Sequence, residues 1–237
     1  MQKQTRVTAM FDDIAPRYDF LNHFLSLHID KIWRRKTAKR LAHCAPKNIL
    51  DIATGTGDMV IQLAKRCPTA NLTGIDLSEK MLAIGKEKIE KQGLDTQIRM
   101  EIGDACALPY NDNSFDAISV AFGARNFSDL EAGLREMQRV LTDEGHIAIW
   151  EFSMPKNKVF RVLYNIYFTK ILPCIGKVIS KNSTAYDYLP ISVAQFPHPD
   201  TFINIISDCG LECSEKTSLS LGIATLYLCR KKQKREK

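Results

Sequence analysis

The chain lacks the patterns that mark a disulfide framework, a zinc site or a secreted protein. It has seven cysteines among 237 residues, which is an odd number, and they are scattered along the chain without a C-x-x-C pair. This spacing argues against disulfide pairing and zinc binding, and it fits a reducing cytosol. Residues 1–20 contain no apolar core of the signal-peptide kind, so we expect a cytoplasmic location.

Long apolar runs, internal repeats and low-complexity linkers are also missing. No apolar run approaches the length of a membrane-spanning helix, so we expect a protein that is soluble or peripheral to a membrane. The content of 45% hydrophobic and 25% charged residues is that of an ordinary globular protein. A chain of this length is long enough to bury a substantial core.

Positive charge is concentrated in one place. The formal net charge is +6, and much of it lies in the C-terminal tail, residues 230–237. Such runs are usually solvated, and contact with an anionic membrane surface is the alternative. No aromatic-rich basic face accompanies the tail, so we do not expect nucleic acid as a partner.

From residue 48 onwards, predicted strands alternate with predicted helices. We expect strands at Asn48–Ala53, Leu72–Asp76, Ile98–Ile102, Phe115–Ala121 and His146–Phe152. We expect helices at Asp58–Arg66, from a cap at Ser78 to about Gln92, and at Leu130–Leu141. A helix at Pro199–Cys209, a short strand at Leu211–Lys216 and a final strand at Ser218–Cys229 follow. The alternation predicts a doubly wound α/β fold, a parallel sheet with helices on both faces.

The strongest local feature is a strand that runs directly into a glycine turn and a helix, Leu50–Asp58, which contains Asp51. Glycines such as Gly55 and Gly57 let the backbone approach a ligand closely, and helix N–H groups point into the gap. Asp76 ends the next strand, where a carboxylate is placed to accept hydrogen bonds from an adenosine ribose. Asp104-Ala105 follows the third strand. Ligands of open sheets lie outside the carboxyl ends of the strands, so we expect these loops to converge on one nucleotide-like ligand.

Asp58 and Val60, which follow the turn, favour S-adenosylmethionine (SAM) over NAD as the ligand. A dinucleotide fingerprint has glycine or alanine where Val60 stands. A carboxylate at Asp58 would repel a pyrophosphate but would attract the sulfonium and ammonium of SAM. The alternative is that Asp58 only complements the helix dipole.

The chain resembles the class I SAM-dependent methyltransferases, and within them the ubiquinone/menaquinone biosynthesis C-methyltransferase family (UbiE/MenG). The resemblance covers nearly the whole chain and includes the glycine turn. It is most specific at Tyr18–Asn22 (YDFLN) and Phe122–Asn126 (FGARN), motifs that generic SAM enzymes lack. It implies a Rossmann-like core with N-terminal helices and an inserted lid.

We expect a single methyltransferase domain with five parts; the lid is expected because residues 154–198 break the alternation of strands and helices, are rich in aromatics and include four prolines. The five parts are a helical cap at 1–45, a SAM-binding core at 46–153, a substrate lid at 154–198, a C-terminal helix and strands at 199–229, and a basic tail at 230–237. Thr56, Asp76, Asp104 and Ala105 match the family's SAM-binding positions. Asp30 stands where the family usually has histidine, and Ala121 stands where some members have a serine that contacts SAM.

The function implied by the resemblance is C-methylation of demethylmenaquinol to menaquinol, with SAM as methyl donor and no metal. One alternative substrate is 2-polyprenyl-6-methoxy-1,4-benzoquinol of ubiquinone synthesis. A different small acceptor, such as a sterol or a phenol, and a non-catalytic SAM-binding subunit of a quinone-synthesis complex also remain open. The expected partner is a prenylated quinol, with a homodimer and contact with the inner face of the membrane left open.

Ring methylation needs an electron-rich ring. A quinol hydroxyl resembles a phenol with a pKa near 10, so ionising it at pH 7 costs about 4 kcal/mol. Arg125, just after the fourth predicted strand, is our candidate for offsetting part of that cost, and a salt bridge that holds the loop is the alternative. Tyr18 and Asp19 are further catalytic candidates, and His198 is a candidate general base.

The expected lid contains an apolar segment, residues 159–168, that is flanked by lysines. This composition suits a channel for the isoprenoid tail that opens towards an anionic membrane, and a core helix is the alternative. Tyr186 and Tyr188 either line the ring pocket or pack in the core.

Overall fold

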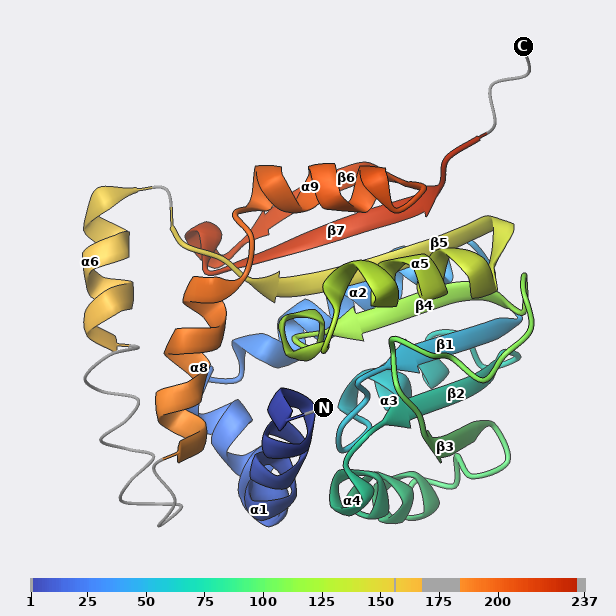
Figure 1. Cartoon of the computed structure of the whole chain (residues 1–237). Coiled ribbons are helices and arrows are strands. Elements are labelled where there is room, and N and C mark those ends of the chain that lie inside the picture. The colour runs from blue at the N-terminus through green and yellow to red at the C-terminus, as the bar shows by residue number, and fades with distance from the viewer. Residues whose placement is uncertain (1, 156, 168–183, 234–237) are drawn as a thin grey trace.

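The computed structural model describes residues 2–155, 157–167 and 184–233, and it contains a single seven-stranded sheet (Figure 1). The strands are β1 (Asn48–Ile52), β2 (Asn71–Asp76), β3 (Ile98–Ile102), β4 (Phe115–Ala121), β5 (Leu141–Phe152), β6 (Leu211–Leu219) and β7 (Ala224–Lys231). The helices are α1 (Gln2–Leu25), α2 (Ile29–Ala42), α3 (Asp58–Ala64), α4 (Glu79–Glu90), α5 (Leu130–Val140), α6 (Lys158–Ile166), α8 (Thr184–Gln195) and α9 (Pro199–Asp208). The short 3₁₀ helices are η1 (Ala124–Asn126) and η3 (Ser220–Gly222).

The strand order is β3-β2-β1-β4-β5-β7-β6, and β7 runs antiparallel to both of its neighbours. The chain winds outwards from β1 through β2 to β3, then returns to place β4 on the other side of β1. The switch point between β1 and β4 is where an open α/β sheet leaves a crevice for a ligand. The predicted doubly wound α/β class is therefore confirmed.

Helices cover both faces of the sheet because successive residues of each strand point to opposite sides. Ile49 belongs to a buried cluster that includes Trp33 of α2 and Leu63 of α3. Leu50, its neighbour in β1, belongs to the cluster on the other face, with Leu134 of α5 among its members. Figure 1 shows α5 and α9 in front of the sheet and α2 and α3 behind it.

The largest differences from the predicted boundaries lie in β5 and in the last two strands. Strand β5 begins at Leu141 rather than His146, and its pairing with β4 shifts register between Phe115 and Ala117. The predicted final strand Ser218–Cys229 is wrong, because η3 interrupts it. Ser218 belongs to β6, and the chain reverses before β7 begins at Ala224, so the two strands form an antiparallel pair.

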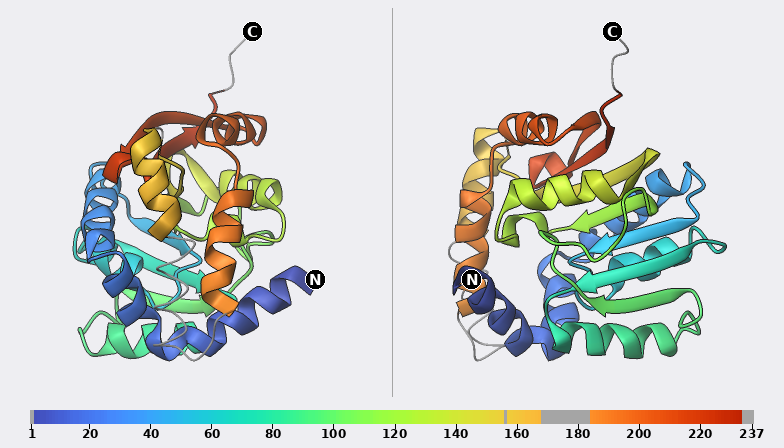
Figure 2. Two further views of the ribbon diagram at one scale, coloured as in Figure 1. Left: turned by 90° about the vertical axis from the view of Figure 1, so that its left-hand side faces the viewer. Right: turned by 45° about the vertical axis from the view of Figure 1, so that its right-hand side comes forward.

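The two ends of the chain lie at different edges of the molecule. Helix α1 lies beside the carboxyl ends of the parallel strands, near α8, and the C-terminus leaves from the opposite end of β7 (Figures 1 and 2). The predicted basic tail begins inside β7, where Arg230 pairs with Glu212 and Lys231 pairs with Asp143. Within the described residues, no helix has both the length and the apolar character needed to cross a bilayer.

Candidate active site

A small cavity lies at the carboxyl ends of the parallel strands, where the sequence predicts the cofactor site. Gly55, Asp76, Asp104 and Ala105 line it, so four of the predicted SAM residues are brought together. Its volume is about 90 Å³, well below the ~300 Å³ at the lower end for ligand pockets. Four residues from the N-terminal half of α1, Gln4, Val7, Thr8 and Phe11, form part of its wall.

Backbone hydrogen bonds hold the Asp76 carboxylate in a fixed position. Its Oδ2 accepts from the N–H of Gly55 and its Oδ1 from the N–H of Ser78, each at 2.9 Å. Burial raises the pKa of Asp76 above its ordinary value, although these N–H groups act in the opposite direction. Asp76 is therefore a preoriented acceptor with lone pairs left for a ligand's hydroxyl groups.

The turn after β1 leaves open space at Gly55. Its φ is +56°, and a Cβ built there would meet no atom within 4 Å. Glycine adopts this left-handed conformation without the steric cost of other residues. The backbone is therefore exposed to the cavity, as the approach of a ligand requires.

Three predicted cofactor residues do not line this cavity. Asp51 is fully buried beneath it, where the hydroxyls of Thr54 and Ser119 donate to its carboxylate at 2.6 and 2.5 Å. Burial raises the pKa of Asp51 to about 6. Thr56 and Gly57 also lie outside the lining.

The expected attraction between Asp58 and SAM is not supported by the structure. Asp58 lies outside the cavity lining and pairs with Lys88 Nζ at 2.5 Å and with Arg34 at 3.4 Å. Although burial opposes the change, these two cations lower the pKa of Asp58. Its charge is therefore already compensated by side chains of α4 and α2.

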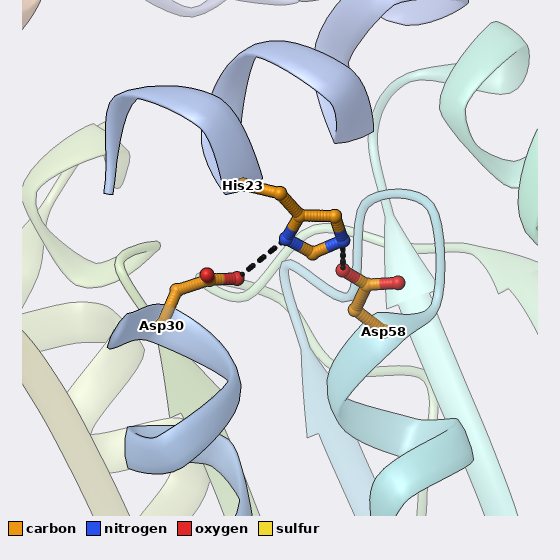
Figure 3. A group of neighbouring side chains, drawn as sticks. All are labelled: His23, Asp30 and Asp58. Carbon is orange, nitrogen blue, oxygen red and sulfur yellow. Dashed lines mark hydrogen bonds and ion pairs between the residues drawn. The ribbon is translucent and has the colours of Figure 1, made fainter. Parts of the chain in front are cut away.

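Asp58 belongs to a cluster with His23 and Asp30 that offers three atoms of the metal-ligand type (Figure 3). His23 Nδ1 lies 2.8 Å from Asp30 and its Nε2 lies 3.5 Å from Asp58. Arg34 bonds to the Asp30 carboxylate. Guanidinium and ammonium groups thus neutralise both carboxylates, so the cluster is an ion-pair network that joins α1, α2 and α3.

Helix α1 is fastened over the cofactor cavity by polar contacts along its length. Gln4 Nε2 donates to Asp104 Oδ2 at 2.7 Å, and the Ser78 hydroxyl donates to Asp12 at 2.5 Å. Asp19, a predicted catalytic residue, pairs with Lys88 Nζ at 2.7 Å and accepts a hydrogen bond from Thr56. Asp19 lines neither cavity, and its described contacts attach α1 to Lys88 of α4 and to Thr56.

A second and larger cavity of about 530 Å³ adjoins the first. Most of its wall is apolar or aromatic, with contributions from α1, α6, α8 and the turn between β6 and β7. Phe11, Tyr18 and Phe122 line both cavities. A ligand in the larger cavity therefore lies against the cofactor cavity along these three residues.

Arg125 lines the larger cavity and is held by an ion pair. Its guanidinium lies 2.9 Å from Glu151 Oε2, and the side chains of both residues are at most 8% exposed. The Arg125 backbone N–H donates to Glu151 Oε1 at 3.1 Å. The centre of the Phe152 ring lies 5.4 Å from the guanidinium carbon. Within the described residues, Arg125 Nε is buried and has no hydrogen-bond partner.

Glu151 was not among the residues predicted for the site. It is an acid in a strand whose neighbouring residues are buried and apolar, Ile149 and Trp150. A charged residue is almost never fully buried without a partner. Its position in an apolar strand was therefore the available signal for an ion pair.

Among the described side chains, four tyrosines line the larger cavity: Tyr18, Tyr164, Tyr167 and Tyr188. Burial raises the pKa of each hydroxyl, and the positive charge of Arg125 acts in the opposite direction on Tyr18, Tyr164 and Tyr188. Tyr188 donates to Asn126 at 2.8 Å. The tyrosines stay protonated at neutral pH and can act as donors.

The remaining predicted residues either lie away from both cavities or fall where the structure describes no side chain. His198 precedes α9, with its side chain 59% exposed, and lines neither cavity. Tyr186 belongs to α8. Residues 168–183, including the end of the predicted apolar segment, lie outside the described residues.

The sheet order, the glycine turn and the carboxylates at the strand ends are those of a class I SAM-dependent methyltransferase. The crystal structure of a SAM-dependent methyltransferase from Aquifex aeolicus has the same fold. It superposes with a TM-score of 0.54 at 19% identity, covering 77% of this chain and 81% of that one.

The chain belongs to the ubiE/COQ5 methyltransferase family, whose sequence model matches residues 1–231. The ubiquinone/menaquinone biosynthesis C-methyltransferase UbiE of Geotalea daltonii is 44% identical over 227 residues, 95% of this chain and 96% of the relative. The demethylmenaquinone methyltransferase of Bacteroides fragilis is 44% identical over 230 residues, 97% of this chain and 94% of the relative. The family predicted from the sequence motifs is confirmed.

Proposed function

We propose that the protein transfers the methyl group of SAM to a ring carbon of demethylmenaquinol. The observation that carries the proposal is the contact between the two cavities along Phe11, Tyr18 and Phe122. A cofactor in the smaller cavity would face a flat apolar ring in the larger one. The names of the relatives from Geotalea daltonii and Bacteroides fragilis support this substrate class.

The residues around the smaller cavity fit SAM. Asp76 and Asp104 are carboxylates at the strand ends, Gly55 leaves its backbone open, and Ala105 presents little bulk. When bound, SAM supplies an electrophilic methyl group. Asp76 would accept the ribose hydroxyls, and the N-terminal part of α1 would move away from Asp104 to admit the cofactor.

In our proposal, Arg125 stabilises the negative charge that develops on the quinol oxygen. Arg125 lines the larger cavity, and its Nε–H has no hydrogen-bond partner among the described residues. Ionising a phenol-like hydroxyl at pH 7 costs about 4 kcal/mol, and a fixed positive charge in a largely apolar cavity offsets part of that cost. Arginine keeps its proton, so this role is electrostatic and a water molecule would carry the proton away.

Tyr18 and Glu151 would complete this arrangement. Tyr18 lies at the boundary of the two cavities and would donate to a ring oxygen. Glu151 holds the Arg125 guanidinium by the ion pair at 2.9 Å. The aromatic walls would orient the ring so that its carbon faces the methyl group in line.

Methyl transfer from SAM to carbon requires no metal, and we propose none. A prenylated substrate also implies that the enzyme works at a membrane surface, on the cytoplasmic side. Homodimer formation and the absence of a nucleic-acid partner stay predictions of the sequence.

The test is a methyl-transfer assay with labelled SAM and two reduced substrates, demethylmenaquinol and 2-polyprenyl-6-methoxy-1,4-benzoquinol. We expect label on the ring carbon of the naphthoquinol. Labelling of the benzoquinol alone would assign the enzyme to ubiquinone synthesis. SAM binding without turnover of either quinol would identify a non-catalytic subunit and contradict the proposal.

A further inference from the structure

Among the side chains that the structure describes, three apolar ones both line the larger cavity and face solvent. They are Leu27 (78% exposed), Leu221 (66%) and Phe160 (41%), from the α1–α2 turn, the β6–β7 turn and α6. Residues that belong to a cavity wall and also to the surface mark the opening of the cavity. This cavity therefore opens through an apolar rim built from three separate segments.

The backbone at two of these positions is unfavourable for leucine. Leu27 has a φ of 50° and Leu221 a φ of 59°, in the left-handed region that glycine and asparagine adopt more readily. An exposed leucine there gains little from packing within the fold. Both leucines therefore suggest an apolar contact outside the protein.

A basic groove of about 600 Å³ lies directly beside the opening, between α2 and the end of β6. Trp33 and Ser220 line both the groove and the larger cavity. Ile32, Lys36 and Lys39 form one wall of the groove at helical spacing. The overall charge of α2 is strongly positive, because Asp30 is its only acid beside six cations: Lys31, Arg34, Arg35, Lys36, Lys39 and Arg40.

Lys36 and Lys39 carry charge that the protein does not compensate. Neither has an ion-pair partner among the residues that the structure describes, whereas Arg40 pairs with Glu215 and Arg34 with Asp30. Both lysines are exposed. Unpaired ammonium groups beside an apolar rim are complementary to lipid phosphates above acyl chains.

We propose that this surface docks on an anionic phospholipid bilayer. We define the docking face by Leu27, Ile32, Lys36, Lys39, Phe160 and Leu221. The leucines and Phe160 enter the acyl region, and Lys36 and Lys39 bind lipid phosphates in the groove. This inference rests on the proposed function, because the isoprenoid tail of the quinol passes from the cavity into the bilayer between the two leucines.

The docking face includes Phe160 of the predicted apolar segment but not the basic tail, the other membrane contact suggested by the sequence. The predicted basic tail begins at the C-terminal end of β7, and η3 lies at the other end of that strand (Figure 1). Arg230 and Lys231 already pair with Glu212 and Asp143. Attachment through the docking face therefore does not require the tail.

Vesicle flotation with two paired variants tests the docking face. Vesicles of phosphatidylcholine with phosphatidylglycerol are compared with pure phosphatidylcholine. Leu27→Asn with Leu221→Asn should weaken partitioning about tenfold or more, since asparagine tolerates the left-handed backbone but has no apolar side chain. Lys36→Gln with Lys39→Gln should weaken it about tenfold on the anionic vesicles, and added salt should remove this difference.

The matched control is Lys80→Gln with Lys86→Gln, which removes the same charge from exposed positions on α4. Its partitioning should stay within about twofold of the parent, a bound that follows from the short range of screened charges. Equal losses in the control and the Lys36/Lys39 variant would overturn the proposal. A change in dimerisation by the leucine variant, measured by sedimentation and without loss of vesicle binding, would also overturn it.

Failure of the docking face is distinguishable from failure of the proposed function. The Lys36→Gln/Lys39→Gln variant should keep parental turnover of a tail-less, water-soluble naphthoquinol while losing vesicle binding. If the proposed function is wrong, no quinol is methylated by any variant, but the differences in vesicle binding remain.

Discussion

Because the Asp51 carboxyl is buried, we expect the free energy of unfolding to depend on its protonation and therefore on pH. Its pKa in the folded protein is about 6, compared with 3.8 for the unperturbed group, because burial penalises the charged form. A difference of about two units corresponds to about 3 kcal/mol, since each unit is worth ~1.4 kcal/mol. The folded state binds the proton more tightly than the unfolded state, so the free energy of unfolding falls as pH rises between about 4 and 6.

Asp51→Asn removes this titration and keeps a polar group between Thr54 and Ser119. We expect the variant to be more stable than the parent by about 1–3 kcal/mol at pH 7. The difference should shrink to about a few tenths of a kcal/mol at pH 3.5, where the parent carboxyl is protonated in the folded state and mostly protonated in the unfolded state. Urea denaturation of both proteins from pH 3.5 to pH 7.5 measures this directly. A constant difference at all pH values, or a variant that loses stability only above pH 6, would refute the reasoning.

Three further predictions concern the cofactor cavity and the Arg125 ion pair. Asp76→Ala should weaken SAM binding by about 2–4 kcal/mol, because two charge-assisted hydrogen bonds are lost, and calorimetric affinity within twofold of the parent would contradict the assignment. Gln4→Ala should strengthen SAM binding about threefold to tenfold, because SAM no longer has to break the hydrogen bond between Gln4 and Asp104, which is worth about 1 kcal/mol. Weaker SAM binding by this variant would show that α1 helps to hold the cofactor. Glu151→Gln should lower the free energy of unfolding by about 3 kcal/mol in urea denaturation, since Arg125 loses its buried counter-charge, whereas an unchanged value would mean that the ion pair contributes little.

The parallel half of the fold was predictable because its strands are short apolar runs that end in turn residues. β1, β2, β3 and β4 lie within about one residue of their predicted bounds. The end of the sheet was less predictable. The one signal in the apolar run of residues 218–229 is Gly222, which has a φ of 98°. A lone glycine did not indicate the division between two antiparallel strands, because the chain reverses there without a turn-forming pair such as Asn-Gly.

The cofactor cavity was predictable to the extent that strand ends determine it. Asp76, Asp104 and Ala105 follow parallel strands, so the sheet itself places them at one edge. The ion pairs of the Asp58 side chain were not predictable. Its partners Lys88 and Arg34 belong to helices distant in sequence, and only the packing of α2 and α4 brings them together.

The central claim is that Arg125 stabilises the developing quinolate, and single-turnover kinetics of Arg125→Met tests it most directly. The double variant Arg125→Met/Glu151→Gln is measured beside it, because it leaves no unpaired buried carboxylate. In both variants we expect kcat to fall about 10²–10³-fold while the SAM affinity stays nearly unchanged, and Arg125→Lys should recover only part of the rate. The loss should shrink as pH rises towards the pKa of the quinol. If the double variant folds but loses SAM binding, or keeps the parental rate, then Arg125 serves the loop or the cofactor and not the transition state.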